Sequence, residues 1–138
     1  MADKNSVRLE WLGEGLRFRG RGTEPQSPAI ELDGDSTAGP NPMSALLLAC
    51  GGCTGIDAVL LLQKMRVLLA GCTVDVSGVR RPEEPRRYTS MKFLFRLAGE
   101  GLDEAKAHRA VRLSFEKYCS AIHSLAPDVD LSYEIEIA

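Results

Sequence analysis

The stretch from residue 41 to residue 71 decides the fold, and it reads NPMSALLLACGGCTGIDAVLLLQKMRVLLAG. Asn41 and Pro42 are typical of a helix start, because the asparagine side chain accepts hydrogen bonds from the first free amides and proline leaves no amide unpaired. The apolar run that follows predicts a helix from Pro42 to about Leu69, with Gly71 as its stop. At 1.5 Å per residue this helix is about 40 Å long, close to the diameter of a compact domain of this size.

The middle of the predicted helix is apolar on nearly all sides. One sheet cannot cover such a surface, so a second packed layer or a second copy of the chain is required, and we expect a homodimer. Residues 45–62 also have about the length of a membrane span. Thr54, Asp57 and the three glycines of this segment fit a helix buried in protein better than a helix in lipid, so we expect no membrane partner.

Short strands flank the helix on both sides. Two strands within residues 6–20 are separated by Gly13-Glu14-Gly15, which is typical of a hairpin. Alternating apolar residues predict further strands at 29–32, 73–79, 89–97 and 131–137.

A second helix is predicted after Leu102, with apolar residues at three- and four-residue steps. It extends no farther than Leu125, because Pro127 ends it, and Cys119 lies on its inward stripe. The predicted elements alternate along the chain, with strands before, between and after two helices, and this order predicts an α+β fold. We expect one domain that covers residues 1–138.

The charge balance argues against a nucleic-acid partner. The 138 residues carry 17 Lys and Arg against 19 Asp and Glu, a formal charge of -2, so no global positive field exists. The one basic cluster is Arg80, Arg81, Arg86 and Arg87, which straddles two prolines and is expected to be a solvated loop. The polar start lacks an apolar signal core and favours a cytoplasmic location, where the four cysteines are free thiols or a catalytic pair.

The motif Cys50-Gly-Gly-Cys53 admits a thioredoxin-like interpretation. That chemistry needs the pair where a strand meets a helix start, whereas helix-forming sequence from Pro42 onward precedes Cys50. Residues three apart in a helix keep their Cβ atoms about 5–6 Å apart, farther than the roughly 3.8 Å of a relaxed disulfide. The glycines of the motif could break the helix, so this alternative stays open.

A metal site is a second alternative. Its candidate ligands are Cys50, Cys53, Cys119, His108 and His123, but their spacing is irregular and includes no second close Cys or His pair. We expect no metal and no other cofactor.

The third interpretation is a pair formed by Cys53 and Cys119, which the fold would bring together. Cys50 and Cys72 are expected to be buried as apolar residues. Cys53 differs, because three glycines surround it and allow a neighbouring element or a substrate to approach the helix closely.

Five motifs together resemble the OsmC and Ohr family, the osmotically induced and organic-hydroperoxide-resistance proteins. They are Gly39-Pro-Asn-Pro-Met43, Gly52-Cys-Thr-Gly-Ile-Asp57, Pro85-Arg-Arg-Tyr-Thr89, Gly101-Leu-Asp-Glu-Ala105 and Glu116-Lys-Tyr-Cys-Ser120. They span most of the chain in the family's order. The resemblance implies antiparallel sheets wrapped around the long central helices of an intertwined homodimer, with active sites at the subunit interface.

The resemblance also implies an activity. The family's peroxidatic cysteine falls on Cys53 and its resolving cysteine on Cys119, so the protein resembles a thiol-dependent peroxidase that reduces alkyl or lipid hydroperoxides. The Cys53 thiolate becomes a sulfenic acid and condenses with Cys119 to a disulfide. A lipoyl-type or thioredoxin-like dithiol then reduces the disulfide, without metal, haem or flavin. The alternative is a non-catalytic stress or small-ligand-binding protein with the same fold.

The sequence departs from the family's better-studied peroxidases at Met43, where they carry a glutamate that pairs with an activating arginine. It resembles a branch with Pro-Met and Gly-Gly-Cys motifs. The arginine is expected in the N-terminal hairpin, at Arg17 or, failing that, Arg19, where it would favour the Cys53 thiolate. Asp57, one helical turn beyond Cys53, would oppose that thiolate, so we expect its carboxylate to pair with a group on another helix.

Overall fold

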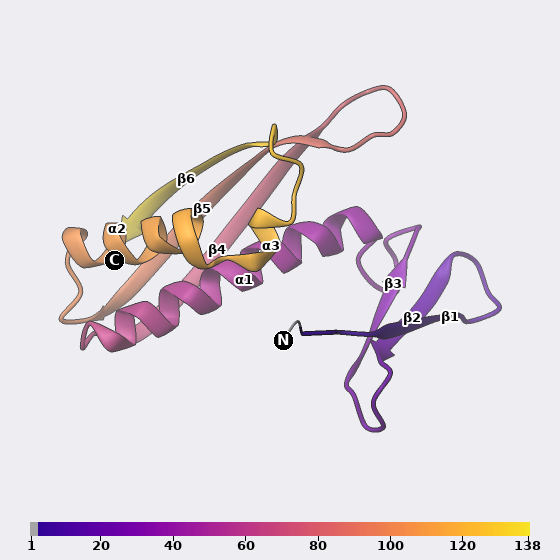
Figure 1. The fold of residues 1–138 in the computed structure, drawn as a ribbon, viewed down its shortest axis with the longest axis horizontal. Helices are drawn as coiled ribbons and strands as arrows, with labels where there is room; N and C mark the ends of the chain where they lie inside the picture. The colour runs from indigo at the N-terminus through magenta and orange to yellow at the C-terminus, as the bar shows by residue number, and fades with distance from the viewer. Residues whose placement is uncertain (1–2) are drawn as a thin grey trace. The chain divides into compact units, whose positions relative to one another are not determined.

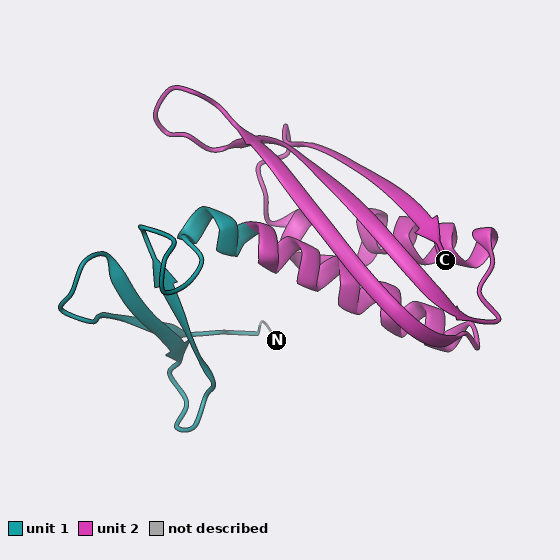
Figure 2. Cartoon of the chain, turned by 180° about the vertical axis from the view of Figure 1, so that it is seen from behind, with its two compact units in different colours: residues 1–46 teal, residues 47–138 magenta. Residues whose placement is uncertain are grey.

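The computed structural model describes residues 3–138, whose contacts group into two compact units (Figure 2). The first unit ends at Leu46, and the second extends from Leu47 to Ala138. The first contains an antiparallel sheet with the order β1-β2-β3, formed by β1 (Val7–Trp11), β2 (Arg17–Gly22) and β3 (Ala29–Asp33). The predicted N-terminal hairpin and the strand after it are confirmed.

The loop after β3 is organised around the buried carboxylate of Asp33. This carboxylate accepts hydrogen bonds from the amides of Asp35 and Ala38, at 2.9 and 3.0 Å, and from the Thr37 hydroxyl at 2.7 Å. The Ala38 amide and then these other donors lower the pKa of Asp33 to about 2. The loop therefore depends on a charged carboxylate.

Because the Asp33 pKa is lower in the folded chain than the usual value of about 3.9, its charge stabilises the fold above that value. This contribution is lost as the pH falls towards about 2. We expect Asp33→Asn to destabilise the protein at neutral pH, and the difference from wild type to shrink as the pH approaches about 2. Denaturant unfolding across this range measures it, with Asp35→Asn as the control, since only the amide of Asp35 binds Asp33. A stability difference that does not change with pH would contradict this prediction.

The long helix α1 (Pro42–Lys64) starts as predicted and ends earlier than predicted. At its start the Asn41 side chain accepts a hydrogen bond from the Ser44 amide at 2.8 Å. The expected end at Leu69 is wrong, because Arg66 adopts a positive φ of 65° and the Val67 amide bonds back to the Leu62 carbonyl. The chain reverses there, and Leu68 and Leu69 already belong to the next strand.

The second unit contains the sheet β4-β5-β6, formed by β4 (Leu68–Arg80), β5 (Tyr88–Glu100) and β6 (Asp130–Ile137). Strands β4 and β5 are antiparallel, but β6 pairs with β5 in parallel, so the expectation of antiparallel sheets holds only in part. One face of this sheet is charged: Arg96 binds both Asp75 and Glu136, and Lys92 pairs with Glu134.

The opposite face of this sheet is covered by helices, as both views show (Figures 1 and 2). Helix α1 lies against β4, and Gly51 and Gly55 permit the close approach, because a Cβ on Gly51 would meet Val76 at 2.8 Å and one on Gly55 would meet Val74 at 3.3 Å. The expectation that these glycines let a neighbouring element approach is confirmed.

The rest of this face packs against the second helical segment. It consists of α2 (Glu104–Leu113), a π-helical turn η1 (Ser114–Tyr118) and the short α3 (Ser120–His123). The Phe115 ring lies edge-on to Phe93, with centroids 5.0 Å apart, and 4.8 Å from the ring of Tyr133. The prediction of one continuous helix is wrong: the chain leaves helical geometry at Cys119, where φ is −73° and ψ is 104°.

The outer side of α1 remains apolar in the single chain. Leu48, Ile56 and Leu60 are 64%, 62% and 53% exposed, at intervals of one or two helical turns. By length and composition α1 could also cross a membrane. On its inner side, where Gly51 and Gly55 approach β4, the residues Cys50, Thr54, Ala58 and Leu62 are buried.

Candidate thiol site

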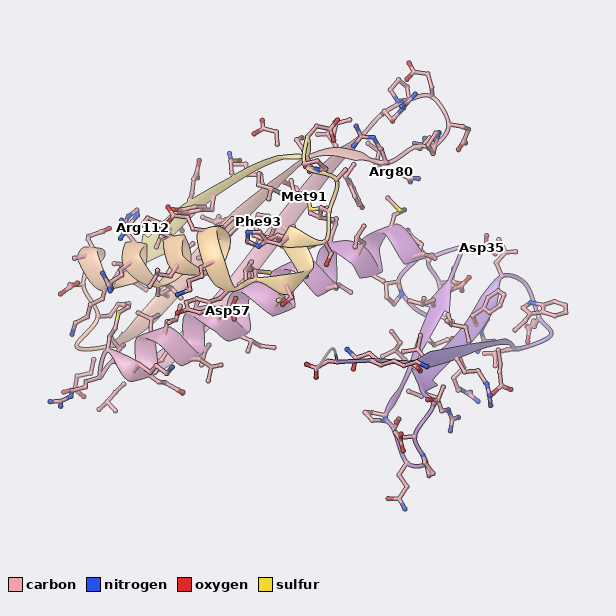
Figure 3. The ribbon with its side chains drawn as sticks, viewed as in Figure 1. Asp35, Asp57, Arg80, Met91, Phe93 and Arg112 are labelled. Carbon is pink, nitrogen blue, oxygen red and sulfur yellow. The ribbon has the colours of Figure 1, made fainter. Side chains whose placement is uncertain are left out.

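Two cysteines from distant parts of the chain meet in the second unit. Cys53 lies in the middle of α1, and Cys119 lies at the break between η1 and α3. Their sulfurs and a carboxylate oxygen of Asp57 all lie within 4.8 Å of one another. Figure 3 shows Asp57 between α1 and the segment that follows α2. The structure thus brings together the two cysteines that the sequence singles out and adds a carboxylate.

The position of Cys119 follows from the distorted end of the second helix. The wider π turn carries the Cys119 amide back to the Ser114 carbonyl at 2.8 Å, and the thiol then caps α3 by accepting the Ile122 amide at 3.5 Å. The side chain is fully buried. Burial raises the pKa of the Cys119 thiol to about 12, with a partial offset from the Ile122 amide and a further rise from the neighbouring Cys53.

The two cysteines of the pair have unlike surroundings. Cys53 is partly exposed, whereas Cys119 has no exposed surface. Next to Cys53, Gly52 is exposed and nothing lies within 4 Å of the place where a Cβ would stand. A small molecule can therefore approach Cys53 more readily than Cys119.

The other two cysteines lie in structural positions. Cys50 is fully buried on the side of α1 that faces the sheet, and burial raises the pKa of its thiol. Cys72 is half-buried in β4, and burial raises its pKa as well. Because α1 is continuous through residues 50–53, a bridge between Cys50 and Cys53 would require the helix to break. The four thiols are free.

Asp57 is held by a residue that the sequence analysis did not single out. The Ser114 hydroxyl, buried at the start of η1, donates a hydrogen bond to Oδ2 of Asp57 at 2.8 Å. The expected pairing of Asp57 with a group on another helix is confirmed. Ser114 lies five positions before Cys119, a spacing that does not place two residues on one face of a regular α-helix, so the sequence carries no signal for this contact.

Arg17 forms an arginine–glutamate pair, but its partner is Glu31 of β3 and not a residue at the position of Met43. Its guanidinium donates two hydrogen bonds to Glu31 of β3, at 3.2 and 3.1 Å, and lies 3.6 Å from Glu14. Arg19 on the same strand is exposed. Both arginines belong to the first unit and Cys53 to the second, and an activating arginine remains a prediction.

Within residues 3–138, one group of side chains has the geometry to hold a metal ion, and it consists of Cys53, Asp57 and Cys119. They offer three of the four ligands of a closed zinc site. The two histidines of the predicted ligand pool are engaged elsewhere: His108 lies 3.4 Å from Glu104, and Nδ1 of His123 is 2.7 Å from the Cys119 carbonyl.

The fold and this cluster define a small α+β protein with a paired-thiol site. The family model of OsmC-like proteins matches residues 33–134. Protein YhfA of Escherichia coli strain K12 is 39% identical over 132 residues, which cover 95% of this chain and 96% of that protein. The chain belongs to the OsmC-like protein family, and the resemblance stated from the sequence motifs is confirmed.

Solved structures agree with this assignment. A hypothetical protein from Aquifex aeolicus VF5 matches with a TM-score of 0.84 and 27% identity, over 99% of both chains. The organic hydroperoxide resistance protein OhrB of Bacillus subtilis matches with a TM-score of 0.61 and 15% identity, over 97% of this chain and 98% of that chain. This second likeness shows a shared fold, so the predicted α+β class of the OsmC and Ohr proteins is confirmed.

Proposed function

We propose that this protein is a cysteine-based peroxidase that reduces organic hydroperoxides. The observation that carries the proposal is the pair Cys53 and Cys119, whose sulfurs lie within 4.8 Å of each other in unlike surroundings. A partly exposed thiol suits attack on a peroxide, and a buried thiol beside it suits the later closing of a disulfide. OhrB of Bacillus subtilis, an organic hydroperoxide resistance protein, has the same fold and supports the same reaction class.

The proposed reaction has three steps. The Cys53 thiolate attacks the outer oxygen of the hydroperoxide, the O–O bond breaks, and the alkoxide leaves as an alcohol after it takes a proton. The Cys119 sulfur then attacks the Cys53 sulfenic acid, and a disulfide and water form. An external dithiol, lipoyl-type or thioredoxin-like, reduces the disulfide by thiol–disulfide exchange.

Apolar surface beside Cys53 supports alkyl or lipid hydroperoxides as substrates. Ile56 and Leu60 follow Cys53 along the exposed side of α1. Burying a hydrocarbon tail against such side chains contributes about 25 cal/mol per Å² of apolar surface. Hydrogen peroxide has no hydrocarbon tail and would gain none of this binding free energy.

A direct assay tests the proposal. Reduced protein should consume an alkyl hydroperoxide with the loss of two thiols per molecule of peroxide, and a dithiol should restore both. Binding of the hydroperoxide or its alcohol without loss of thiols would instead favour a non-catalytic binding protein. Thiol titration beside peroxide quantification distinguishes these outcomes.

The exposed apolar side of α1 supports a homodimer with a site at the interface between copies. We expect light scattering to give twice the chain mass of 15.0 kDa. Ile56→Glu should weaken the dimer at least about tenfold, because it places a charge in an apolar contact. Gln63→Glu, at an exposed polar position of the same helix, is the control. A folded wild-type monomer would contradict the proposal.

Arg17 is the proposed activating residue, because the family resemblance implies an arginine in the N-terminal hairpin and the bidentate pair with Glu31 holds the Arg17 guanidinium in one orientation. We expect Arg17→Ala to slow the attack of Cys53 on hydroperoxide about tenfold near neutral pH, since a nearby cation favours the thiolate. Arg19→Ala is the matched control on the same strand, and equal rates for Arg17→Ala and wild type at neutral pH would remove the assignment.

A further inference from the structure

The proposed disulfide step requires two proton transfers, and each needs a group inside the site that donates or accepts the proton. The Cys119 thiol must lose its proton to attack, because the thiolate is the nucleophile. The hydroxide that leaves the Cys53 sulfenic acid must gain a proton to depart as water. Cys119 is fully buried, so bulk water does not reach it.

The environment of Cys119 keeps the thiol protonated until the attack. The side chain has no exposed surface, and burial raises the pKa of the Cys119 thiol, so the proton must pass to a group inside the site. A base at the site can accept this proton while the S–S bond forms.

Asp57 is the carboxylate in reach of both sulfurs. Its oxygen lies within 4.8 Å of the Cys53 and Cys119 sulfurs, a separation that one bridging water can close. The other ionisable side chains of the segment that carries Cys119 are less suited, since Glu116 and Lys117 are exposed. The His123 ring bonds to the Cys119 carbonyl.

Ser114 fixes the carboxylate. Its hydroxyl is buried and donates to Oδ2 of Asp57 at 2.8 Å, so a contact between α1 and η1 sets the orientation of the Asp57 side chain. Holding one oxygen in this way leaves the carboxylate a second oxygen that can accept a proton.

We propose that Asp57 transfers the proton of Cys119 to the leaving hydroxide during disulfide formation, an inference that rests on the proposed peroxidase function. The Cys119 S–H proton passes to the Asp57 carboxylate while the Cys119 sulfur bonds to the Cys53 sulfur. The S–O bond of the sulfenic acid breaks, and its hydroxide takes the proton from Asp57 and leaves as water. The carboxylate is regenerated, and no further oxidant or reductant is consumed.

The test separates the two chemical steps in full-length protein, with a chelator present to exclude metal ions. Rapid mixing with one equivalent of alkyl hydroperoxide, followed by dimedone trapping and mass spectrometry, measures sulfenic acid formation and then its loss to the disulfide. Asp57→Asn keeps the shape of the side chain and an oxygen that can accept the Ser114 hydrogen bond. We expect it to form the sulfenic acid at a rate within about threefold of wild type and to close the disulfide about 100-fold more slowly.

Further variants separate proton transfer from a structural role. Asp57→Glu should recover part of the rate of disulfide formation, and His123→Gln should leave both steps unchanged. In the wild type the disulfide step should be slower in D2O, a measurement that stands even where a variant fails to fold. Disulfide formation at the wild-type rate in Asp57→Asn, or no solvent isotope effect in the wild type, would overturn the inference. A wild-type protein that forms no sulfenic acid would instead remove the proposed function itself, and this inference with it.

Discussion

Replacing Cys53 by serine should abolish the reduction of organic hydroperoxides, with turnover falling at least about 10³-fold. A serine hydroxyl is not ionised near neutral pH and cannot accept the peroxide oxygen as a thiolate does. The substitution changes one atom of a partly exposed side chain in α1, so the fold should persist. Steady-state consumption of an alkyl hydroperoxide, with a dithiol as reductant, measures the effect.

Matched controls come from the two cysteines outside the pair. Cys50→Ala keeps an apolar side chain on the buried side of α1, and Cys72→Ser changes a half-buried position in β4. Both variants should retain turnover. Full activity in Cys53→Ser, or loss of activity in Cys50→Ala with an intact fold, would assign the reaction to another thiol.

Replacing Cys119 by serine should leave one turnover and then stop the enzyme. Cys53 would still attack the hydroperoxide, but no thiol would lie within 4.8 Å on the facing segment to condense with the sulfenic acid. Excess hydroperoxide should then convert Cys53 to the sulfinic acid, and steady-state turnover should fall at least about 100-fold. Mass spectrometry of the intact protein after one and after several equivalents distinguishes these states.

The Cys119→Ser result also bears on the thioredoxin-like interpretation of Cys50 and Cys53. If these two formed the functional bridge, the variant would continue to turn over with a dithiol. Sustained turnover would therefore contradict the role given to Cys119.

Much of the fold was predictable because local chemistry specifies it. The Asn41 cap and Pro42 fix the start of α1, and strict alternation identifies the long strands of the second sheet. The end of α1 was not predictable in this way. The apolar pattern of the helix continues through Val67, Leu68 and Leu69. The chain reverses at Arg66 through a positive φ, and no glycine stands there to indicate the turn.

The candidate site was predictable in part. The glycines around Cys53 and the family motifs pointed to Cys53 in α1, and the apolar stripe placed Cys119 on the inner side of the second segment. The break at Cys119 was not predictable, because the stripe continues through it while η1 widens the turn. The hydrogen bond between Asp57 and Ser114 joins residues 57 positions apart, which only the tertiary structure brings together.

The most direct test of the central claim is to identify the disulfide that forms when reduced protein receives one equivalent of an alkyl hydroperoxide. Non-reducing peptide mapping of the alkylated, digested protein gives the answer. We expect one bridge, between Cys53 of α1 and Cys119 at the start of α3, with Cys50 and Cys72 recovered as alkylated thiols. A bridge between Cys50 and Cys53, or oxidised protein in which Cys119 remains a free thiol, would contradict it.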